Sequence, residues 1–567
     1  MRSQNPESAA RVSADFGLPI AISRALLSRN LAHPDEIALY LDPPRELIDI
    51  RGLLPNLEEA ASRVLSALDA RTPILVYGDY DVDGIAASTV LFGALKTLAA
   101  KSNVYLPSRF GEGYGLSVAA LERAKNAGYG MVVTVDCGIG SIAEVEAARA
   151  MGLDIVITDH HTLGDTLPDT VIVNPLLREN ATSGGESTAA NPCGAAVALG
   201  LAGELFWKRG RDRGEAANRW LEIVALATIA DSMALIGVNR AIVRHGIDQM
   251  WDTTNPGLRA LLEATGVGTG AAPTAEQLAF GVIPALNACG RMLSPRLAFS
   301  LFEAKSADEA RQIAHQIKGL NSERQLVQER VFEEAARMAS EDRGAPAHVL
   351  FCEHWHAGVL GIVAAQIAET FGKPAVVLSC AHGEDGGIRG SARAPAGWDL
   401  RAALEASAAH LDKFGGHPSA AGISLSPDSL EAFREAFCGA IAAAQQIAGN
   451  GELQIDAEAS AAEMAAVDLD SLLRLEPTGE GNPAPVFALR QCMIEAPRAI
   501  GRNGTTLVCN IEQGGTRFKA VGFRMSHIAA RFKEGAPYDI AVALKPDFYG
   551  GVRSVRCQLL DAVPSSR

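Results

Sequence analysis

Short, continuously apolar runs that alternate with helical stretches constrain the fold of the N-terminal half more than any other feature. The runs are rich in Val and Ile and cover 73–77, 104–106, 131–135, 155–158 and 171–173. Helical patterns fill 84–99 and 141–151 between them. Strands that are apolar on both sides are buried on both faces, as in a largely parallel sheet covered by helices. We therefore expect an α/β domain over 69–250, after a helical lead-in at 1–68.

The middle of the chain predicts a connector and a second α/β unit. Apolar residues at three- to four-residue spacing on a charged background predict one long helix over 301–340, within a helical connector at 251–340. Two further apolar runs, 348–351 and 375–378, with Gly-rich turns place the second unit at 341–450. The long helix would connect two lobes.

Beyond a Pro/Gly-rich segment at 476–485 the pattern alternates like short β-strands, which predicts a small barrel within 451–567. From 486 to 567 there are 12 Lys+Arg against 6 Asp+Glu, a net charge of +6, in a chain of net charge −15. A uniformly basic nucleic-acid-binding surface is therefore excluded, whereas a basic C-terminal domain is predicted.

Aromatic and basic side chains interleave in this C-terminal domain. They are Arg502, Arg517, Phe518, Lys519, Phe523, Arg524, Lys545, Phe548, Tyr549, Arg553 and Arg556. Cations that follow phosphates and rings that stack on bases are what single-strand binding needs. The alternative is that the rings fill the barrel core, and we expect about half of them to do so.

Cysteine usage and hydropathy point to a reducing compartment. Nine cysteines are scattered without a CxxC pair, which argues against a zinc ribbon or a disulfide framework and for a cytoplasmic protein. The first 17 residues contain no apolar core, and no 18-residue apolar run occurs, so we expect neither a signal peptide nor a membrane span.

Carboxylates follow three of the early strands. These polar strand ends contain Asp79, Asp81, Asp83, Asp136, Asp159, His160 and His161. Because ligands in open α/β sheets bind at the carboxyl ends of the strands, these side chains should converge, with Asp231 as a further contributor. So many carboxylates repel one another unless cations neutralise them. Oxygen ligands with one or two imidazoles suit two Mg²⁺ or Mn²⁺ ions, which activate water against a phosphodiester.

Simpler interpretations exist for single residues. An Asp after a strand is usually a helix N-cap, which is our interpretation of Asp165 and Asp169. The DxDxDG pattern at 79–84 also resembles the start of a calcium loop, but the Glu expected at loop position twelve is missing. The whole set of strand ends favours metal catalysis.

Four motifs resemble those of the DHH phosphoesterase superfamily: VYGDYDVDG at 76–84, VDCG at 135–138, TDHH at 158–161 and AD at 230–231. The segment FGGHPSAAG at 414–422 resembles the signature of the associated DHHA1 domain. The resemblance covers about 70–560. It implies a two-lobed fold with a parallel-sheet catalytic lobe, a long connecting helix, a DHHA1 substrate-binding lobe and a C-terminal OB-fold barrel.

The resemblance also implies roles for individual residues. It makes Asp81, Asp83, Asp136, His160 and Asp231 metal ligands, with Asp136 as the bridge and Asp79 as a ligand or its neighbour. Asp159 would orient the histidine that binds metal, and His161 would face the scissile phosphate. Arg109, Ser391 and Arg393 would hold a 5′-terminal phosphate, and Arg291 and His417 would contact substrate.

The activity implied is metal-dependent 5′→3′ degradation of single-stranded DNA to mononucleotides, in DNA recombination and repair. The expected protein is a cytoplasmic monomer that does not bind membranes and cooperates with a helicase and a single-strand-binding protein. One alternative is a DHH phosphodiesterase for short oligonucleotides or cyclic dinucleotides, which would not need the basic barrel. The other is a non-catalytic replicative-helicase subunit, which predicts lost carboxylates that this chain retains.

Overall fold

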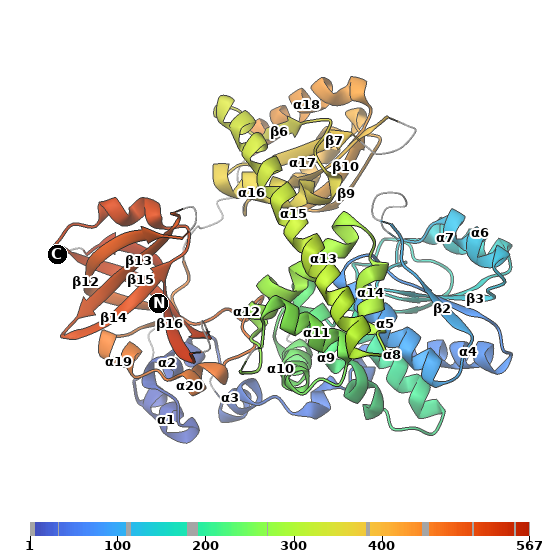
Figure 1. Cartoon of the computed structure of the whole chain (residues 1–567), viewed down its shortest axis with the longest axis horizontal. Coiled ribbons are helices and arrows are strands. Elements are labelled where there is room, and N and C mark those ends of the chain that lie inside the picture. The colour runs from blue at the N-terminus through green and yellow to red at the C-terminus, as the bar shows by residue number, and fades with distance from the viewer. Residues whose placement is uncertain are drawn as a thin grey trace.

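The computed structural model describes residues 6–31, 33–108, 115–178, 191–268, 270–380, 386–444, 453–501, 504–548 and 552–565. Three sheets form three bodies, and one long helix runs from the first body to the second (Figure 1). Among the described helices, none has both the length and the apolar character needed to cross a bilayer.

The first sheet is parallel throughout, as the apolar runs predict, with the strand order β2-β1-β3-β4-β5. Its strands are β1 (Ile74–Tyr77), β2 (Ser102–Tyr105), β3 (Met131–Val135), β4 (Asp154–Thr158) and β5 (Val171–Val173). Alternate residues of β1 enter different cores: Ile74 and Val76 pack on one face, and Leu75 and Tyr77 on the other. Both faces are therefore buried, which is why these strands show no polar alternation.

Helices cover both faces of this sheet. The helices of this lobe are α4 (Leu57–Asp69), α5 (Val82–Thr97), α6 (Val118–Asn126), α7 (Ile142–Ala150), α8 (Gly194–Lys208), α9 (Gly214–Ala230), α10 (Gly237–Trp251), α11 (Pro256–Thr265), α12 (Ala275–Gln277), α13 (Ile283–Met292) and α14 (Arg296–Phe302). Side chains from α6 and α7 pack on one face, and α4, α5, α8 and α9 share the core of the other. The predicted connector is thus partly catalytic lobe, because α11, α13 and α14 are buried in that same core.

The long helix is α15 (Ala307–Glu341), which begins at 307 and not at 301 because Ser306 caps it. The Ser306 side chain accepts a hydrogen bond from the Glu309 N–H, which satisfies an otherwise unpaired donor of the first turn. Its first half packs in the catalytic core through Ala314 and Ile317, and its second half packs in another core through Val331 and Ala335. It therefore connects the lobes, as predicted.

The second lobe is a mixed sheet in the order β6-β7-β8-β10-β9, flanked by helices. Its elements are β6 (His348–Phe351), the short helix η5 (Ala357–Val359), α16 (Leu360–Phe371), β7 (Ala375–Cys380), β8 (Ile388–Arg393), α17 (Leu400–Ala406), β9 (Lys413–His417), β10 (Ala420–Leu425) and α18 (Leu430–Ala443). Only β6 and β7 pair in parallel; the other pairs are antiparallel.

The third body is a barrel that closes through pairing of β12 with β15. Its elements are β11 (Ala457–Glu458), α19 (Ala461–Ala465), α20 (Leu469–Leu473), β12 (Val486–Ile500), β13 (Thr506–Gln513), β14 (Thr516–Gly522), β15 (Pro537–Asp547) and β16 (Ser554–Pro564). Closure removes the exposed strand edges that a short open sheet would leave.

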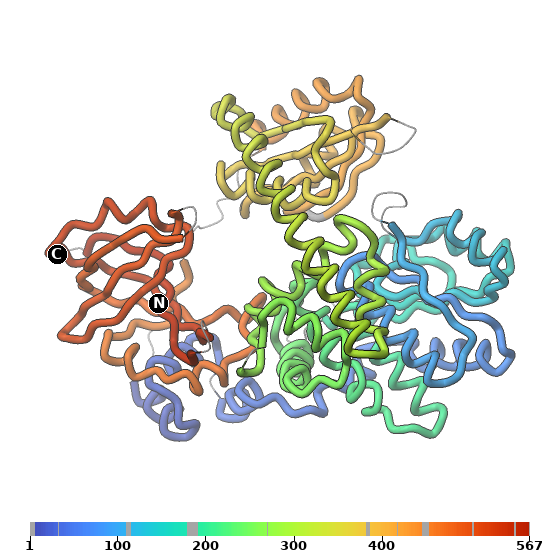
Figure 2. Tube along the Cα trace, in the orientation of Figure 1, coloured from blue at the N-terminus to red at the C-terminus, as the bar shows by residue number. Residues whose placement is uncertain are grey.

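The lead-in at 1–68 is not one unit. Helices α1 (Pro6–Phe16), α2 (Ile20–Ser28) and α3 (Pro34–Leu41) share the barrel core, whereas α4 belongs to the catalytic lobe. Figures 1 and 2 show the N-terminal helices directly beside the C-terminal barrel. Arg29 Nε lies 2.8 Å from Asp456 Oδ1 across this contact. Helices without a sheet of their own bury their apolar side on the barrel, a pairing that local sequence patterns do not reveal.

A buried carboxyl in α9 gives a stability prediction. Glu222 accepts a hydrogen bond from the Thr253 hydroxyl at 2.7 Å on one oxygen, while its other oxygen has no hydrogen-bond partner among the described residues. Burial raises the pKa of Glu222 to about 7. Because the folded pKa lies above the unfolded value, its stabilising effect is full below about pH 4.5 and is lost as the pH rises through 7.

We therefore expect Glu222→Gln to raise the unfolding free energy at pH 8 by up to about 3 kcal/mol and to change it little at pH 4.5. Urea unfolding at the two pH values measures this. An equal effect of the substitution at both values would contradict the assignment.

Candidate metal centre

The polar strand ends meet at the carboxyl edge of the first sheet, as expected. Their donor atoms form three overlapping groups, each within 4.8 Å: Asp79, Asp81 and Asp136; Asp83, His160 and Asp231; and Asp136, His160 and His161. The strands β1, β3 and β4 are neighbours in the sheet, so their ends lie side by side. Asp231 joins them from the C-terminal end of α9.

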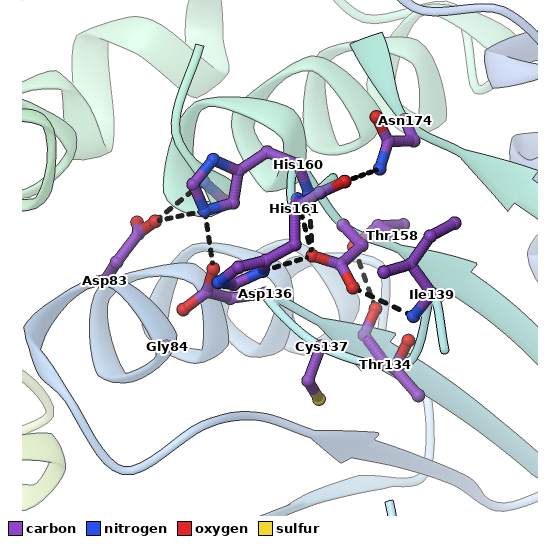
Figure 3. A network of polar contacts seen from close by, with 12 residues as sticks. Asp83, Gly84, Thr134, Asp136, Cys137, Ile139, Thr158, His160, His161 and Asn174 are labelled. Atoms are coloured by element: carbon purple, nitrogen blue, oxygen red, sulfur yellow. Dashed lines mark hydrogen bonds and ion pairs between the residues drawn. The ribbon is translucent and has the colours of Figure 1, made fainter. Parts of the chain in front are cut away.

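His160 and Asp136 lie where these groups overlap (Figure 3). The Nε2 atom of His160 is 3.1 Å from Asp136 Oδ1, 3.6 Å from Asp83 Oδ2 and 3.5 Å from Asp231 Oδ2. His160 Nε2 and Asp136 Oδ1 are buried, and neither makes a hydrogen bond with the described part of the chain. Two buried ligand atoms that face each other in this way fit a site for a cation.

The backbone at Asp136 is held in an unusual conformation. Its φ is +61°, in the left-handed region that non-glycine residues rarely adopt, and its N–H donates to the Thr158 carbonyl at 3.0 Å. A Cβ at Gly194 would lie 2.5 Å from Asp136 Oδ1, so α8 approaches this carboxylate as closely as glycine allows. Such strain at one polar residue is typical of functional sites.

Helix N-termini hold two of the carboxylates. Asp83 accepts hydrogen bonds from the N–H groups of Gly194 and Ala195 at 2.7 and 2.8 Å, at the start of α8. Asp81 caps α5 by accepting from the Gly84 N–H at 3.0 Å. The positive ends of the helix dipoles therefore favour the charged carboxylates here. Asp81 is therefore a helix N-cap whose carboxylate also lies in the cluster.

Asp159 contacts the imidazole of His161, whereas we expected it to orient that of His160. Its Oδ1 lies 2.7 Å from His161 Nδ1 and accepts the N–H groups of His160 and His161, while its Oδ2 accepts the Ile139 N–H. The imidazole of His160 instead turns toward Asp83 and Asp136 (Figure 3). The two ring centroids are 4.5 Å apart, but the rings have different carboxylate partners.

The cluster shifts the proton affinities of its members. Burial, followed by the charges of neighbouring carboxylates, raises the pKa of Asp231 to about 8 and that of Asp136 well above its usual value. Burial lowers the pKa of His160, which favours the neutral imidazole that binds metals. Burial would also lower the pKa of His161, but the hydrogen bond and charge of Asp159 raise it to about 9. These carboxyls retain protons unless cations replace them.

The centre opens into a cavity of about 300 Å³ lined by Asp79, Tyr80, Asp81, Val82, Asp83, His161, Ala230, Asp231, Asn287, Gly290 and Arg291. Arg291 of α13 therefore lies at the site, as expected, and its Nη1 also donates to the Gly358 carbonyl of η5 at 3.3 Å. This contact joins the two lobes beside the cavity. A larger hollow of about 590 Å³ between 45–51 and α8 contains none of these acids.

The predicted phosphate pocket is described only in part. Ser391 and Arg393 lie on one face of β8, and a Cβ at Gly361 would be 3.2 Å from Ser391 Oγ and 3.1 Å from Arg393 Nη2. Both side chains therefore converge on the first turn of α16. Arg109 and the side chain of His417 lie outside the described residues.

Known proteins match the chain along most of its length. Residues 73–228 match the DHH family N-terminal domain, 344–443 the DHHA1 domain and 455–561 the RecJ OB domain. The single-stranded-DNA-specific exonuclease RecJ of Dickeya dadantii is 31% identical over 95% of both chains. The chain belongs to the RecJ family.

Two other relatives of the RecJ family extend the comparison. The Bacillus subtilis RecJ is 31% identical over 90% of this chain, which spans only 64% of that protein's length. A crystal structure of Thermus thermophilus RecJ in complex with Mn²⁺ superposes with a TM-score of 0.82 at 26% identity, covering 100% of this chain and 79% of that one.

Ion pairs engage many of the barrel cations that we expected to follow phosphates in this RecJ-family chain. They are Arg517 with Glu495, Arg524 with Glu369, Arg553 with Asp470, and Lys545 and Arg556 with Glu276. Phe518 packs against the core, whereas the ring of Phe523 is 47% exposed. The C-terminal domain has a net positive charge, but several of its cations form ion pairs within the protein.

Sequence reasoning missed one exposed aromatic. Phe280 is 81% exposed in a π-helical segment, Leu278–Val282, and lines a cavity of about 340 Å³ between the catalytic lobe and the barrel. Ser232 and Met233, directly after Asp231, line the same cavity. The helical periodicity of the connector did not indicate that this side chain is exposed. A π-helical turn often marks a functional position.

Proposed function

We propose that this protein is a divalent-metal-dependent exonuclease that degrades single-stranded DNA from the 5′ end to mononucleotides. The observation that carries the proposal is the buried pair of ligand atoms, His160 Nε2 and Asp136 Oδ1, inside a cluster of carboxylates. The relatives support the substrate, since they are single-stranded-DNA-specific exonucleases by name.

Two groups of side chains would hold the ions. Asp79, Asp81 and Asp136 form one, and Asp83, His160 and Asp231 form the other, with Asp136 close to both. The oxygen-rich set fits Mn²⁺ or Mg²⁺, the ions named with the Thermus thermophilus crystal structures. Bound there, the ions would supply a water of lowered pKa and coordinate phosphate oxygens.

His161 provides a proton donor beside these ligands. Because Asp159 engages Nδ1, we assign Nε2 as the atom that donates to a phosphate oxygen or to the departing 3′ oxygen. The raised pKa keeps this ring charged at neutral pH. Asp159 itself remains ionised, since its hydrogen bond to His161 outweighs the effect of burial and lowers its pKa.

In this proposal the second lobe helps to set the direction of degradation, from the 5′ end. Ser391 and Arg393, with Arg109, would hold a terminal 5′ phosphate, because a guanidinium meets phosphate oxygens bidentately. Arg291 and His417 would contact the strand near the scissile bond. Arg291 lines the cavity and donates a hydrogen bond to the Gly358 carbonyl of the second lobe, so it contacts both.

Strands labelled at the 5′ or the 3′ end test direction and product size. We expect the 5′ label to appear at once as mononucleotide in Mn²⁺ or Mg²⁺, while the 3′-labelled strand shortens progressively. Comparison of a dinucleotide with a long strand separates the proposal from a phosphodiesterase for short substrates. Equal or greater efficiency on the dinucleotide would favour that alternative.

A terminal phosphate should matter to efficiency. A charge-assisted contact contributes about 1.5–3 kcal/mol, so we expect a preference of about ten- to a hundredfold for 5′-phosphorylated over 5′-hydroxyl strands. Arg393→Ala and Arg109→Ala should each shrink this ratio toward one. Arg401→Ala is the matched control, since Arg401 pairs with Glu405 on the surface of the same lobe. A full preference in Arg393→Ala would remove Arg393 from the pocket.

Phe280 would stack on a base between the barrel and the metal centre. A stacked base contributes about 1–3 kcal/mol, so Phe280→Ala should weaken binding of a long single strand about 5- to 150-fold without changing its salt dependence. Phe280→Trp should retain binding, because an aromatic face remains. Fluorescence anisotropy of a labelled strand measures both, and unchanged affinity in Phe280→Ala would show that the strand passes elsewhere.

The cellular setting follows the same proposal. We infer a cytoplasmic monomer that acts in DNA recombination and repair, on single strands exposed by a helicase and shared with a single-strand-binding protein. Light scattering of the purified chain tests the oligomeric state. Degradation of duplex DNA with and without an added helicase tests the dependence on unwinding.

A further inference from the structure

A second group of metal-binding side chains lies outside the carboxylate centre, between α15 and the turn after β6. Glu334 comes from α15, and Cys352 and His354 come from the turn. One donor atom from each residue lies within 4.8 Å of the others. None of the three residues belongs to the DHH motifs.

The separations are close to those of a small tetrahedral site. Cys352 Sγ is 3.3 Å from Nδ1 and 3.5 Å from Nε2 of His354, and His354 Nε2 is 3.7 Å from Glu334 Oε2, so the exposed imidazole has to rotate to direct one nitrogen at an ion. Zinc bonds of about 2.3 Å to sulfur and about 2.0 Å to nitrogen or oxygen place tetrahedral ligand atoms about 3.3–3.6 Å apart. The side chain of His354 is 76% exposed, so water can reach a fourth position.

The surrounding structure holds two of the ligands in place. The indole Nε1–H of buried Trp355 donates to Glu334 Oε2 at 2.8 Å, which orients the carboxylate. The Ser379 hydroxyl donates to the Trp355 carbonyl at 2.6 Å and fixes the turn that presents Cys352 and His354. Hydrogen bonds that orient the ligand side chains in this way are typical of metal sites.

We propose that Glu334, Cys352 and His354 bind a thiophilic divalent cation of the Zn²⁺ class, with water as the fourth ligand. The sulfur and imidazole donors suit zinc better than Mg²⁺ or Mn²⁺, which prefer the oxygen-rich catalytic centre. The two sites therefore select different metals.

Such an ion would join α15 to the segment that leads into η5. Within that segment, the Gly358 carbonyl accepts the hydrogen bond from Arg291 at the catalytic cavity. The ion thus stabilises the junction between the lobes, and no step of the hydrolysis passes through it.

Cobalt is the probe, because a thiolate bound to Co²⁺ gives a charge-transfer absorption that oxygen ligands do not give. We expect the metal-free full-length chain to develop this band with one equivalent of Co²⁺ and to lose it when Zn²⁺ displaces the cobalt. Cys352→Ser should lack the band and bind Zn²⁺ at this site about a hundredfold more weakly. Cys438→Ser, which changes a partly buried cysteine of the same lobe, should behave like the wild type.

A second measurement uses the unaltered protein. Zn²⁺ should slow alkylation of Cys352 by iodoacetamide, read by peptide mass, and leave the rate at Cys438 unchanged. The proposal is overturned if the wild type shows no thiolate band, if Cys352→Ser keeps it, or if Zn²⁺ does not protect Cys352.

Discussion

Replacement of Asp136 by asparagine is expected to lower the rate of single-strand degradation more than about a hundredfold, while the fold and strand binding persist. Asp136 belongs to one proposed ion-binding group and lies 3.1 Å from His160 of the other, so its loss should affect both ions, and metal-bound hydroxide contributes several kcal/mol to such reactions. Asparagine tolerates the positive φ of +61° and keeps the side-chain volume, which protects the fold.

The matched control for this variant is Asp165→Ala, which removes an exposed carboxylate from the loop after β4. It should retain wild-type activity. Circular dichroism and anisotropy with a labelled strand establish that Asp136→Asn is folded and binds DNA. Activity above about one per cent of the wild-type rate would reduce Asp136 from bridge to peripheral ligand.

Removal of the proposed proton donor, His161, should have the second largest effect. General acid catalysis contributes about 10²–10⁴-fold, so we expect His161→Gln to lose activity within that range. Because the active form is protonated, the wild-type rate should fall as the pH rises through about 9, the pKa of His161.

Asp159→Asn separates orientation from chemistry. Without the Asp159 carboxylate the charged imidazole loses its partner, so the alkaline limb of the pH–rate profile should move from about 9 toward the usual histidine value near 6.5. Profiles of kcat against pH for the wild type and the variant measure the shift. An unmoved limb would show that His161 is not the group that titrates.

Much of the fold follows from local patterns in the sequence. The run at 131–135 predicts β3 at its observed bounds, and the acids at three strand ends predict their convergence, because both depend on short-range periodicity and on the geometry of parallel sheets. The long helix is also predictable, since its apolar stripe repeats along its own length. Its start differs by six residues, because Ser306 provides a cap, and its end differs by one.

Long-range pairings between segments do not follow from local sequence patterns. The packing of α1–α3 on the barrel joins segments more than 400 residues apart, and nothing local to residues 1–68 indicates it. Likewise, the adjacency of His160 and His161 does not show which ring Asp159 contacts, because that depends on the turn after β4. The pairing of Glu276 with Lys545 and Arg556 also requires the assembled lobes.

The most direct test of the account is a titration of the metal-free protein with Mn²⁺, with bound metal and single-strand hydrolysis measured together. We predict that two ions bind per chain at the carboxylate centre and that hydrolysis appears as the second site fills, whereas Asp136→Asn binds fewer and stays inactive. Full hydrolysis in the metal-free protein, or wild-type metal binding and activity in Asp136→Asn, would contradict the assignment of this cluster as the catalytic metal centre.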